Sequence, residues 1–521
     1  MCYTFREYTK TRQAPPAGER SPGARRKEVM SVTNILLVCA VLLPLLGGAL
    51  LPLLPTGHRK GLHGTVLALL ILEAGVVTAL LLRPEAEFFL FAMTDSLTVS
   101  LRMDGISKLF LAVGAYGFLI TGVYAFRYLE PGGREKSFFA FFLLALGALA
   151  GMDLAANLTT MYLFFELLTL CSMPMVLHDR TQESIRAALK YLFYSMAGAF
   201  LALCTIFVLS RFCGSLSFNP GGSLDPAKIQ GHETLLRVVV FLGVVGFGAK
   251  AGLYPLHGWL PAAHPVAPAP ASAVMSGIIA KAGVLAILRL IYFCVGTEFL
   301  AGTWVQYAWL GLALLTVFMG SMMAYRETAF KKRLAYSSVS QISYVLTGLF
   351  LLTPTGVLGG LLHVIFHACV KICLFLVAGS FIHNLGFHQV GELKAVGKAM
   401  PKTLWGFTLA SLALVGIPPA SGFISKWYLA EGALSSGLPV YDWLAPVILL
   451  ISALLTAGYL LPITIDGYFP GKDCKSIPAK NDEGGPLMWV PIALLAAASL
   501  LLGVFSGGVT ESLQAVAEGM F

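Results

Sequence analysis

Apolar residues form long uninterrupted runs that alternate with short polar segments along the whole chain. A helix that crosses a bilayer needs about 20 apolar residues in succession. Runs of this kind lie near residues 33–54, 63–82, 107–127, 137–152, 155–177, 188–210, 236–254, 267–294, 303–324, 333–352, 356–383, 402–429, 440–466 and 487–509. The pattern therefore predicts an all-α polytopic membrane protein with about 14 transmembrane helices.

The composition agrees with this prediction. Hydrophobic residues make up 57% of the 521 residues and charged residues only 12%, whereas a soluble domain has about 25% charged residues. This balance excludes a soluble globular enzyme, a disordered protein and a nucleic-acid-binding protein. The chain also lacks a glycine-rich nucleotide-binding motif after a strand and a cysteine set for iron–sulfur ligation. We therefore expect no cofactor in this chain and place any electron transfer in partner subunits.

The nine cysteines are scattered, mostly within apolar runs. Cys369 and Cys373 share a helix face, but neither belongs to a CxxC pair or has a companion carboxylate nearby in the sequence. We predict that they pack as small apolar residues and that the chain binds no metal.

Basic residues between the runs are divided unevenly between the two sides of the membrane. Eighteen belong to one side, and seven belong to the other when residues 1–29 are left out. Because basic residues concentrate in cytoplasmic loops, the first side is predicted to be cytoplasmic and both termini non-cytoplasmic. Residues 1–29 would then place seven basic residues on the non-cytoplasmic side, against this rule. We interpret them as a disordered tail or as an extension upstream of a start at Met30.

Four lysines lie inside apolar runs, where each costs at least about 2.5–3.5 kcal/mol. They are Lys250, Lys281, Lys371 and Lys426. Four such residues indicate a polar pathway through the protein, although snorkelling to the interface is the alternative for each. Glu166, in the middle of the fifth run, is the natural counter-charge, because a movable carboxylate changes how tightly a buried lysine holds its proton. Glu73, in the second run, has no motif around it and is interpreted as a structural or lipid-edge residue.

Three proton-accepting groups recur at intervals of four residues in the eleventh run. They are His363, His367 and Lys371. A helix turns by about 100° per residue, so these side chains fall within roughly 80° of one face. A column of this kind predicts a proton relay rather than isolated packing residues.

Two runs are interrupted by prolines close to a lysine. Pro255 and Pro261 follow Lys250 within residues 252–270. Pro418 and Pro419 precede Lys426 within residues 414–429. Proline breaks a helix, and carbonyl groups freed at membrane depth must face protein or a cavity. Paired interruptions in two halves of a chain are typical of transporters. His257, just beyond the first interruption, is either an access-channel residue or an interfacial one.

Five motifs in order give the chain a family resemblance: FFELLTL, GAKAGLYPLHGWLPAAHPVAPAPASA, KKRLAYSSVSQISY, HACVKICLFLVAG and VGIPPASGFISKWYL. Over about residues 30–510 it resembles the antiporter-like membrane subunits of respiratory complex I. It equally resembles the large subunits of multisubunit sodium/proton antiporters and of membrane-bound hydrogenases.

The resemblance implies two inverted five-helix repeats that contain broken helices, with helices 4–8 at about 137–294 and helices 9–13 at about 303–466. It also implies roles for individual residues. Glu166 and Lys250 match the family's switching pair, and Lys281 matches its eighth-helix lysine. His363, His367 and Lys371 match the central relay, and Lys426 matches the output residue of the broken twelfth helix.

The predicted function is therefore proton translocation within a multisubunit complex that resembles NADH:quinone oxidoreductase or a hydrogenase. The expected location is a bacterial-type cell (inner) membrane, and the expected partners are other membrane subunits, with hydrophilic redox subunits in a redox-driven complex. One alternative is a subunit of a sodium/proton antiporter without redox activity. Another is a non-conducting structural subunit, although scaffolding needs no charge at mid-membrane.

Overall fold

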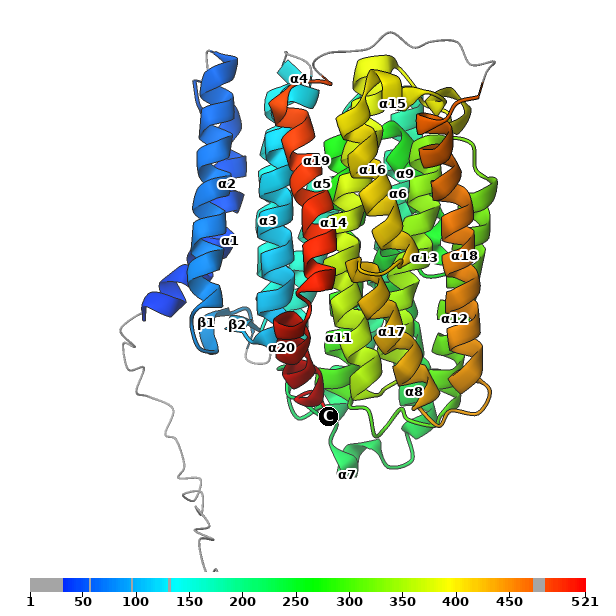
Figure 1. The fold of residues 1–521 in the computed structure, drawn as a ribbon. Coiled ribbons are helices and arrows are strands. Elements are labelled where there is room, and N and C mark those ends of the chain that lie inside the picture. The colour runs from blue at the N-terminus through cyan, green and yellow to red at the C-terminus, as the bar shows by residue number, and fades with distance from the viewer. Residues whose placement is uncertain (1–30, 56–57, 95–96, 130–132, 472–482) are drawn as a thin grey trace, which may run out of the picture.

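The computed structural model describes residues 31–521 except 56–57, 95–96, 130–132 and 472–482. The predicted extension at 1–29 lies outside the described residues. The protein is a bundle of long, nearly parallel helices (Figure 1). Within the described part, twelve segments are long and apolar enough to cross a membrane. The prediction of an all-α polytopic membrane protein is confirmed.

The N-terminal helices form one side of the bundle, where α1 packs on α2 and α4, and α2 packs on α3 (Figure 1). The elements of this part are α1 (Val32–Leu50), η1 (Leu51–Leu53), α2 (Arg59–Leu81), β1 (Ala86–Ala92), β2 (Thr98–Met103) and α3 (Gly105–Tyr128).

The middle of the chain supplies the helices that surround the first interruption. Its elements are α4 (Gly133–Asp153), α5 (Leu158–Val176), α6 (Gln182–Phe212), α7 (Pro226–Ile229), α8 (Glu233–Ala251), η2 (Leu256–Trp259), α9 (Leu260–Val266), α10 (Ala269–Val274), the π-helix η3 (Met275–Ile279), α11 (Lys281–Arg289) and the π-helix η4 (Leu290–Val295).

The C-terminal half contains the second interruption and the longest helix, α14. Its elements are α12 (Trp304–Arg326), α13 (Phe330–Phe350), α14 (Pro354–Leu385), η5 (Val390–Leu393), α15 (Val396–Ala399), α16 (Pro401–Val415), α17 (Ser421–Leu434), α18 (Tyr441–Tyr468), α19 (Pro486–Val504) and α20 (Gly507–Glu518). The hairpin β1–β2, α7 and α20 lie at one end of the bundle, which we call the hairpin end; α15 lies at the other, the α15 end (Figure 1).

Two of the 14 predicted spans are helical but fall outside the twelve apolar segments. The predicted span at 333–352 is α13, whose buried face is unusually polar because it carries Lys331, Ser337, Ser338 and Gln341. The predicted span at 402–429 is divided into α16 and α17, of 15 and 14 residues, each too short to cross a bilayer alone.

Both predicted interruptions are present, and the helix before each one ends in the same backbone conformation. Gly252 ends α8 with φ 80°, and Gly416 ends α16 with φ 90°, the left-handed region that glycine adopts without strain. In each case the amide of the following residue bonds a carbonyl five residues earlier: Leu253 to Gly248 at 2.9 Å and Ile417 to Leu412 at 3.1 Å. This Schellman motif satisfies carbonyl groups in the last turn of a helix. Backbone amides at each interruption therefore cap the helix that precedes it.

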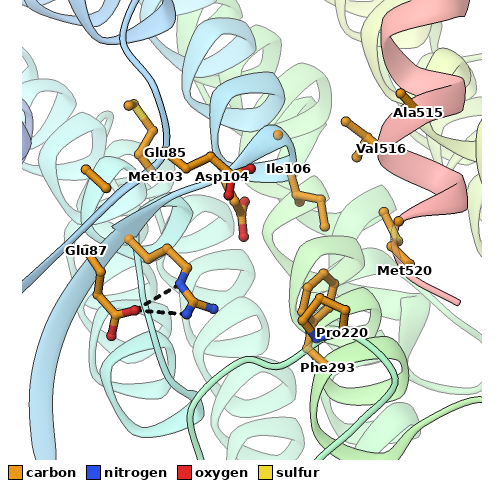
Figure 2. Close-up of a pocket in the computed structure, with 14 residues that line it drawn as sticks. Glu85, Glu87, Met103, Asp104, Ile106, Pro220, Phe293, Ala515, Val516 and Met520 are labelled. Atoms are coloured by element: carbon orange, nitrogen blue, oxygen red, sulfur yellow. Dashed lines mark hydrogen bonds and ion pairs between the residues drawn. The ribbon is translucent and has the colours of Figure 1, made fainter. Parts of the chain in front are cut away.

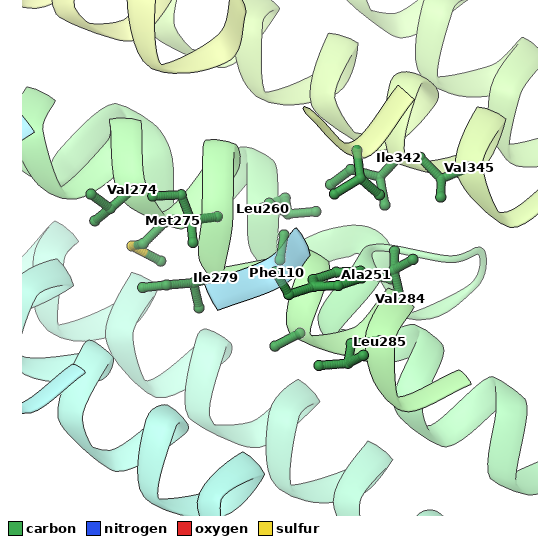
Figure 3. Packing of buried hydrophobic residues seen from close by; sticks show 14 of the residues in the cluster. Phe110, Ala251, Leu260, Val274, Met275, Ile279, Val284, Leu285, Ile342 and Val345 are labelled. Carbon is green, nitrogen blue, oxygen red and sulfur yellow. The ribbon is translucent and has the colours of Figure 1, made fainter. Parts of the chain in front are cut away.

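The segment from α10 to η4 forms the centre of the bundle. All of the most apolar window of Ala269–Val295 is buried, as expected of a helix that is surrounded by other helices. Figure 3 shows side chains of η3 and α11 packed with Leu260 of α9 and with Ile342 and Val345 of α13. The two π-helical turns in this segment were not predicted, because irregular turns inside an apolar run leave no hydropathy signal.

The hairpin β1–β2 was also not predicted. Its antiparallel register pairs Ala86 with Met103 and Phe88 with Leu101, and an irregularity lies between Phe89 and Phe91. Asp104, directly after β2, caps α3 by accepting a hydrogen bond from the Ser107 amide at 2.9 Å. Arg289, at the end of α11, donates two bonds of 2.7 and 2.8 Å to the same carboxylate. This ion pair joins the start of α3 to the end of α11.

The Asp104–Arg289 pair predicts a loss of stability in acid. Burial opposes ionisation of Asp104, but the charge and hydrogen bonds of Arg289 outweigh it and lower the pKa from 3.8 to about 2. Because the folded-state pKa is depressed, the contribution of about 2 kcal/mol is present above about pH 4 and is lost as the pH falls through about 2. Thermal unfolding of the detergent-solubilised protein should show Asp104→Asn destabilised at neutral pH. The difference from wild type should shrink between pH 4 and 2, and a constant difference would contradict the assignment.

Candidate functional site

Lys250 lies at the end of α8, just before the first interruption, and is fully buried. Its ammonium donates to the Phe165 carbonyl at 3.0 Å and to the Thr169 hydroxyl at 2.7 Å. It also lies 4.2 Å from the centroid of the Phe165 ring. Lys250 is thus held against the turn of α5 that carries Glu166.

Glu166 itself does not pair with Lys250 in this structure. Among the described residues, the ion pairs within 4.0 Å include none between these two side chains. The Glu166 carboxylate is partly exposed and accepts a hydrogen bond from the Tyr162 hydroxyl at 3.1 Å. The Lys250 ammonium therefore contacts the turn of α5 that carries Glu166, but the two side chains of the predicted switching pair form no ion pair.

Lys281 begins α11, directly after the π-helix η3. Its ammonium donates to the Ser276 carbonyl at 3.0 Å and to the Gly277 carbonyl at 2.5 Å. The π-helical turn leaves these carbonyls within reach of a side chain, which a regular α-helix would not do. The Ser276 hydroxyl lies 2.6 Å from that of Ser338 on α13, so polar contacts continue from Lys281 to the next helix.

The predicted column on α14 is present, and its members are buried. The rings of His363 and His367 are stacked with centroids 5.7 Å apart. The Nδ1 atom of His363 lies 2.8 Å from the Ser425 hydroxyl of α17. Lys371 donates to the Leu334 carbonyl at 3.1 Å and to the Ser337 hydroxyl, both on α13. The three side chains therefore lie on one buried face of α14.

Lys426 lies on α17, just after the second interruption, and is partly buried. Its ammonium donates to the last carbonyls of α16, those of Leu414 at 2.6 Å and Val415 at 2.9 Å. The C-terminus of a helix carries partial negative charge, so the break in the helix creates the acceptor for this lysine. The ammonium also lies 5.2 Å from the centroid of Tyr344, whose ring stacks on His363.

The four intramembrane lysines share one feature. Each bonds neutral carbonyl or hydroxyl oxygens, and none belongs to an ion pair within the described part of the chain. A neutral acceptor holds an ammonium without a fixed counter-charge, so loss of the proton leaves no unpaired carboxylate behind. This arrangement suits groups that gain and lose protons.

The sequence interpretation missed two residues at the α15 end of this polar series. His264 on α9 is fully buried, stacks on Phe375 with centroids 4.8 Å apart, and has no partner for either ring nitrogen among the described residues. Lys331 at the start of α13 donates to the carbonyls of Pro265 at 3.4 Å and of Ala267. The polar face of α13 at helical spacing was the available signal for Lys331, and His264 lies within one of the quoted motifs.

The remaining candidates lie apart from this series or serve packing. His257 is partly buried and stacks on Tyr254 with centroids 5.7 Å apart. Glu73 is buried in α2, which packs on α1 and α3. Cys373 contacts the carbonyls of Gly406 and Ile492 at 3.8 and 3.6 Å, as a packing residue does. Over the part of the chain that the structure describes, no group of three or more His, Cys, Asp or Glu side chains is placed to hold a metal ion.

Comparison with known proteins identifies relatives of this chain. Residues 155–456 match the family described as NADH:quinone oxidoreductase/Mrp antiporter, TM. The NADH-quinone oxidoreductase subunit N of Desulforudis audaxviator is 32% identical over 84% of this chain and 89% of its own length. The hydrogenase-4 component B of Escherichia coli is 31% identical over 86% of this chain and 67% of its own length.

The fold is also that of a solved structure. A chain in the structure of the Mrp complex from Dietzia sp. DQ12-45-1b superposes with a TM-score of 0.80 at 21% identity, covering 94% of this chain and 98% of that one. The family match spans more than half of the chain, and the first of the two relatives is aligned over most of its length. This multi-pass membrane protein therefore belongs to the NADH:quinone oxidoreductase/Mrp antiporter transmembrane family.

Proposed function

We propose that the chain is a proton-translocating membrane subunit of a multisubunit ion-pumping complex. The observation that carries the proposal is the series of buried polar side chains through the centre of the bundle, on helices that are otherwise apolar. Its buried members are Lys250, Lys281, His363, His367 and Lys371, with the partly buried Lys426 at one end and Glu166 beside the first. Burying so much polarity inside a membrane is costly, and a proton pathway accounts for it.

Unpartnered polar atoms support a hydrated route. Both ring nitrogens of His264 and His367, the Nε2 atom of His363 and the amide of Gln341 are buried without a hydrogen-bond partner among the described residues. Unsatisfied polar groups cost several kcal/mol in a bilayer interior, and buried water is what satisfies such groups in proteins. Water bridging these atoms would join α9, α13 and α14.

The proposed route joins these polar side chains. Protons are taken up near Glu166 and Lys250 from the cytoplasmic side, with His264 and Lys331 as a further uptake position at the α15 end. They pass Lys281 and the column on α14 and leave near Lys426. Movement of Glu166 toward Lys250 would change how tightly each group holds its proton, and this couples a conformational change elsewhere in the complex to transport.

The names of the relatives support membrane subunits as partners. They describe subunits or components of an NADH-quinone oxidoreductase and a hydrogenase, and the solved structure is an Mrp complex. We infer that this chain also assembles with other membrane subunits in a bacterial-type cell membrane, with the α15 end cytoplasmic. In a redox-driven complex, hydrophilic subunits would carry the electrons.

Sodium dependence tests the proposal against its main alternative. The complex purified with this chain is reconstituted into proteoliposomes, and proton movement is followed with a pH-sensitive dye. We expect proton uptake driven by an electron donor, in sodium-free buffer. Sodium-driven proton movement without any donor would instead assign the chain to a sodium/proton antiporter.

A further inference from the structure

A close backbone contact lies beside the lysine at the first interruption. A Cβ atom on Gly283 of α11 would lie 2.6 Å from the Phe247 carbonyl oxygen and 2.6 Å from the Ala251 amide nitrogen. Those two atoms belong to the last turn of α8, which carries Lys250. Atoms in favourable contact are about 3.5–4.0 Å apart, so α11 approaches α8 this closely because Gly283 has no side chain.

The second interruption has the same kind of contact. A Cβ atom on Gly359 of α14 would lie 2.7 Å from the Leu429 amide nitrogen and 3.0 Å from the Tyr428 carbonyl carbon, both on α17. Leu429 follows Lys426 by three residues. The backbone of α14 thus rests on the turn of α17 that follows this lysine.

The contact at Gly359 holds His363 against α17. The two residues are four apart and therefore lie on the same face of α14. The Nδ1 atom of His363 lies 2.8 Å from the hydroxyl of Ser425, which directly precedes Lys426. A side chain at the position of Gly359 would push α14 and α17 apart one helical turn from this hydrogen bond.

The segment that carries Lys281 is held on two sides. Lys281 and Gly283 are two residues apart, so they face roughly opposite sides of α11. Earlier in the same segment, a Cβ atom on Gly277 of η3 would lie 2.5 Å from the Cγ1 atom of Ile372 on α14, the neighbour of Lys371. One glycine thus fits this segment against α8 and another fits it against α14.

We propose that Gly277, Gly283 and Gly359 are positioning residues of the proton route. They fix Lys281 and His363 relative to the two lysines at the interruptions. The inference rests on the proposed function. Transfer between positioned groups depends steeply on their separation, and a displacement of about 1 Å can slow a reaction by about 100-fold.

A large open cavity lies away from these contacts. It has a volume of about 630 Å³ at the hairpin end, and Figure 2 shows Asp104, Phe293 and Val516 at its wall. None of the residues that line this cavity belongs to α8, α11, α14 or α17. Transfer between groups on those four helices therefore depends on how closely the helices pack.

The test replaces a glycine with alanine in the assembled complex. A methyl group on Gly283 or Gly359 would meet backbone atoms of the facing helix, which cannot rotate out of the way, so the helices must separate. We expect Gly283→Ala and Gly359→Ala each to lower proton translocation in proteoliposomes at least about tenfold per assembled complex. The solvent deuterium isotope effect on the rate should rise, because the displaced transfer step becomes rate-limiting.

Gly48→Ala is the matched control. A Cβ atom on Gly48 of α1 would lie 2.6 Å from the Ala140 carbonyl oxygen and 2.8 Å from the Leu144 amide nitrogen, both on α4. The backbone clash is the same, but neither helix carries a member of the polar series. We expect a similar loss of thermal stability with the wild-type rate and isotope effect. An equal loss of rate in all three variants, or a wild-type rate in Gly283→Ala or Gly359→Ala, would overturn the inference.

Gly277 keeps the inference testable if neither of those variants assembles. A methyl group there would meet the Ile372 side chain rather than backbone. Gly277→Ala should therefore lower the rate, and Ile372→Ala in the same chain should restore most of it by removing the atoms that clash. A wild-type rate in Gly277→Ala, or a loss that Ile372→Ala does not restore, would contradict the positioning role.

Lys250→Ala, measured in the same assay, separates the two possible failures. If Lys250→Ala abolishes transport but the glycine variants keep the wild-type rate, only the present inference is overturned. If transport survives Lys250→Ala, the proposed function is wrong.

Discussion

Replacing Lys250 with alanine should abolish proton movement while the complex still assembles. The Lys250 ammonium donates to the Phe165 carbonyl and to the Thr169 hydroxyl. Neither acceptor carries a charge, so removing the ammonium leaves no unpaired carboxylate. Losing a positioned proton carrier should lower the rate by at least about 100-fold. Dye-monitored proton uptake by proteoliposomes, normalised to the amount of assembled complex, measures the effect.

Two further variants sharpen this test. Lys250→Met keeps most of the length of the side chain, so an equal loss of transport would assign the effect to the ammonium rather than to a cavity. Thr169→Val removes one acceptor and leaves the lysine, and we expect a much smaller loss. Transport at the wild-type rate after both Lys250→Ala and Glu166→Ala would contradict the switching role of this pair.

Replacing His367 with leucine should stop proton transfer along α14 without destabilising the protein. His367 is 1% exposed, and neither ring nitrogen has a partner among the described residues. Leucine removes two polar atoms that no described protein group bonds, so no protein partner is left unpaired and the free energy of unfolding should change little. The transport rate should fall by about 100-fold or more, since the column loses its middle member.

His363 provides the contrast within the same column. Its Nδ1 atom bonds the Ser425 hydroxyl, so His363→Leu leaves a buried hydroxyl with a lost partner and should lower both transport and thermal stability. Transport assays and thermal unfolding in detergent on the two variants separate a relay from a packing role. Wild-type transport in His367→Leu would show that the column is not on the route.

The span pattern was predictable because a bilayer imposes a local rule. Each crossing helix must be apolar over about 20 residues, whatever its neighbours. The prolines beside Lys250 and Lys426 indicated the breaks for an equally local reason. The hairpin β1–β2 and the π-helix η3 were missed, because a short hairpin beside an apolar run and an irregular turn within one leave no distinctive hydropathy signal.

The candidate site was only partly predictable. Lysine inside an apolar run is conspicuous from composition alone, so all four were found. Lys331 was counted with the basic loop residues, although its ammonium is directed to the carbonyls of Pro265 and Ala267. Arg289 was likewise counted with the basic loop residues. In the structure it is buried and forms an ion pair with Asp104.

The four lysines inside apolar runs could be identified from the amino-acid sequence, because the energetic cost of burying an ammonium depends on the apolar run that surrounds it. Which oxygen atoms each charged group contacts depends on how the helices pack against one another. Lys250 bonds α5, Lys371 bonds α13 and Arg289 bonds the residue before α3. These partners lie 34 to 185 residues away in the chain, and hydrophobic patterning specifies that helices pack but not which turn of one helix faces which turn of another.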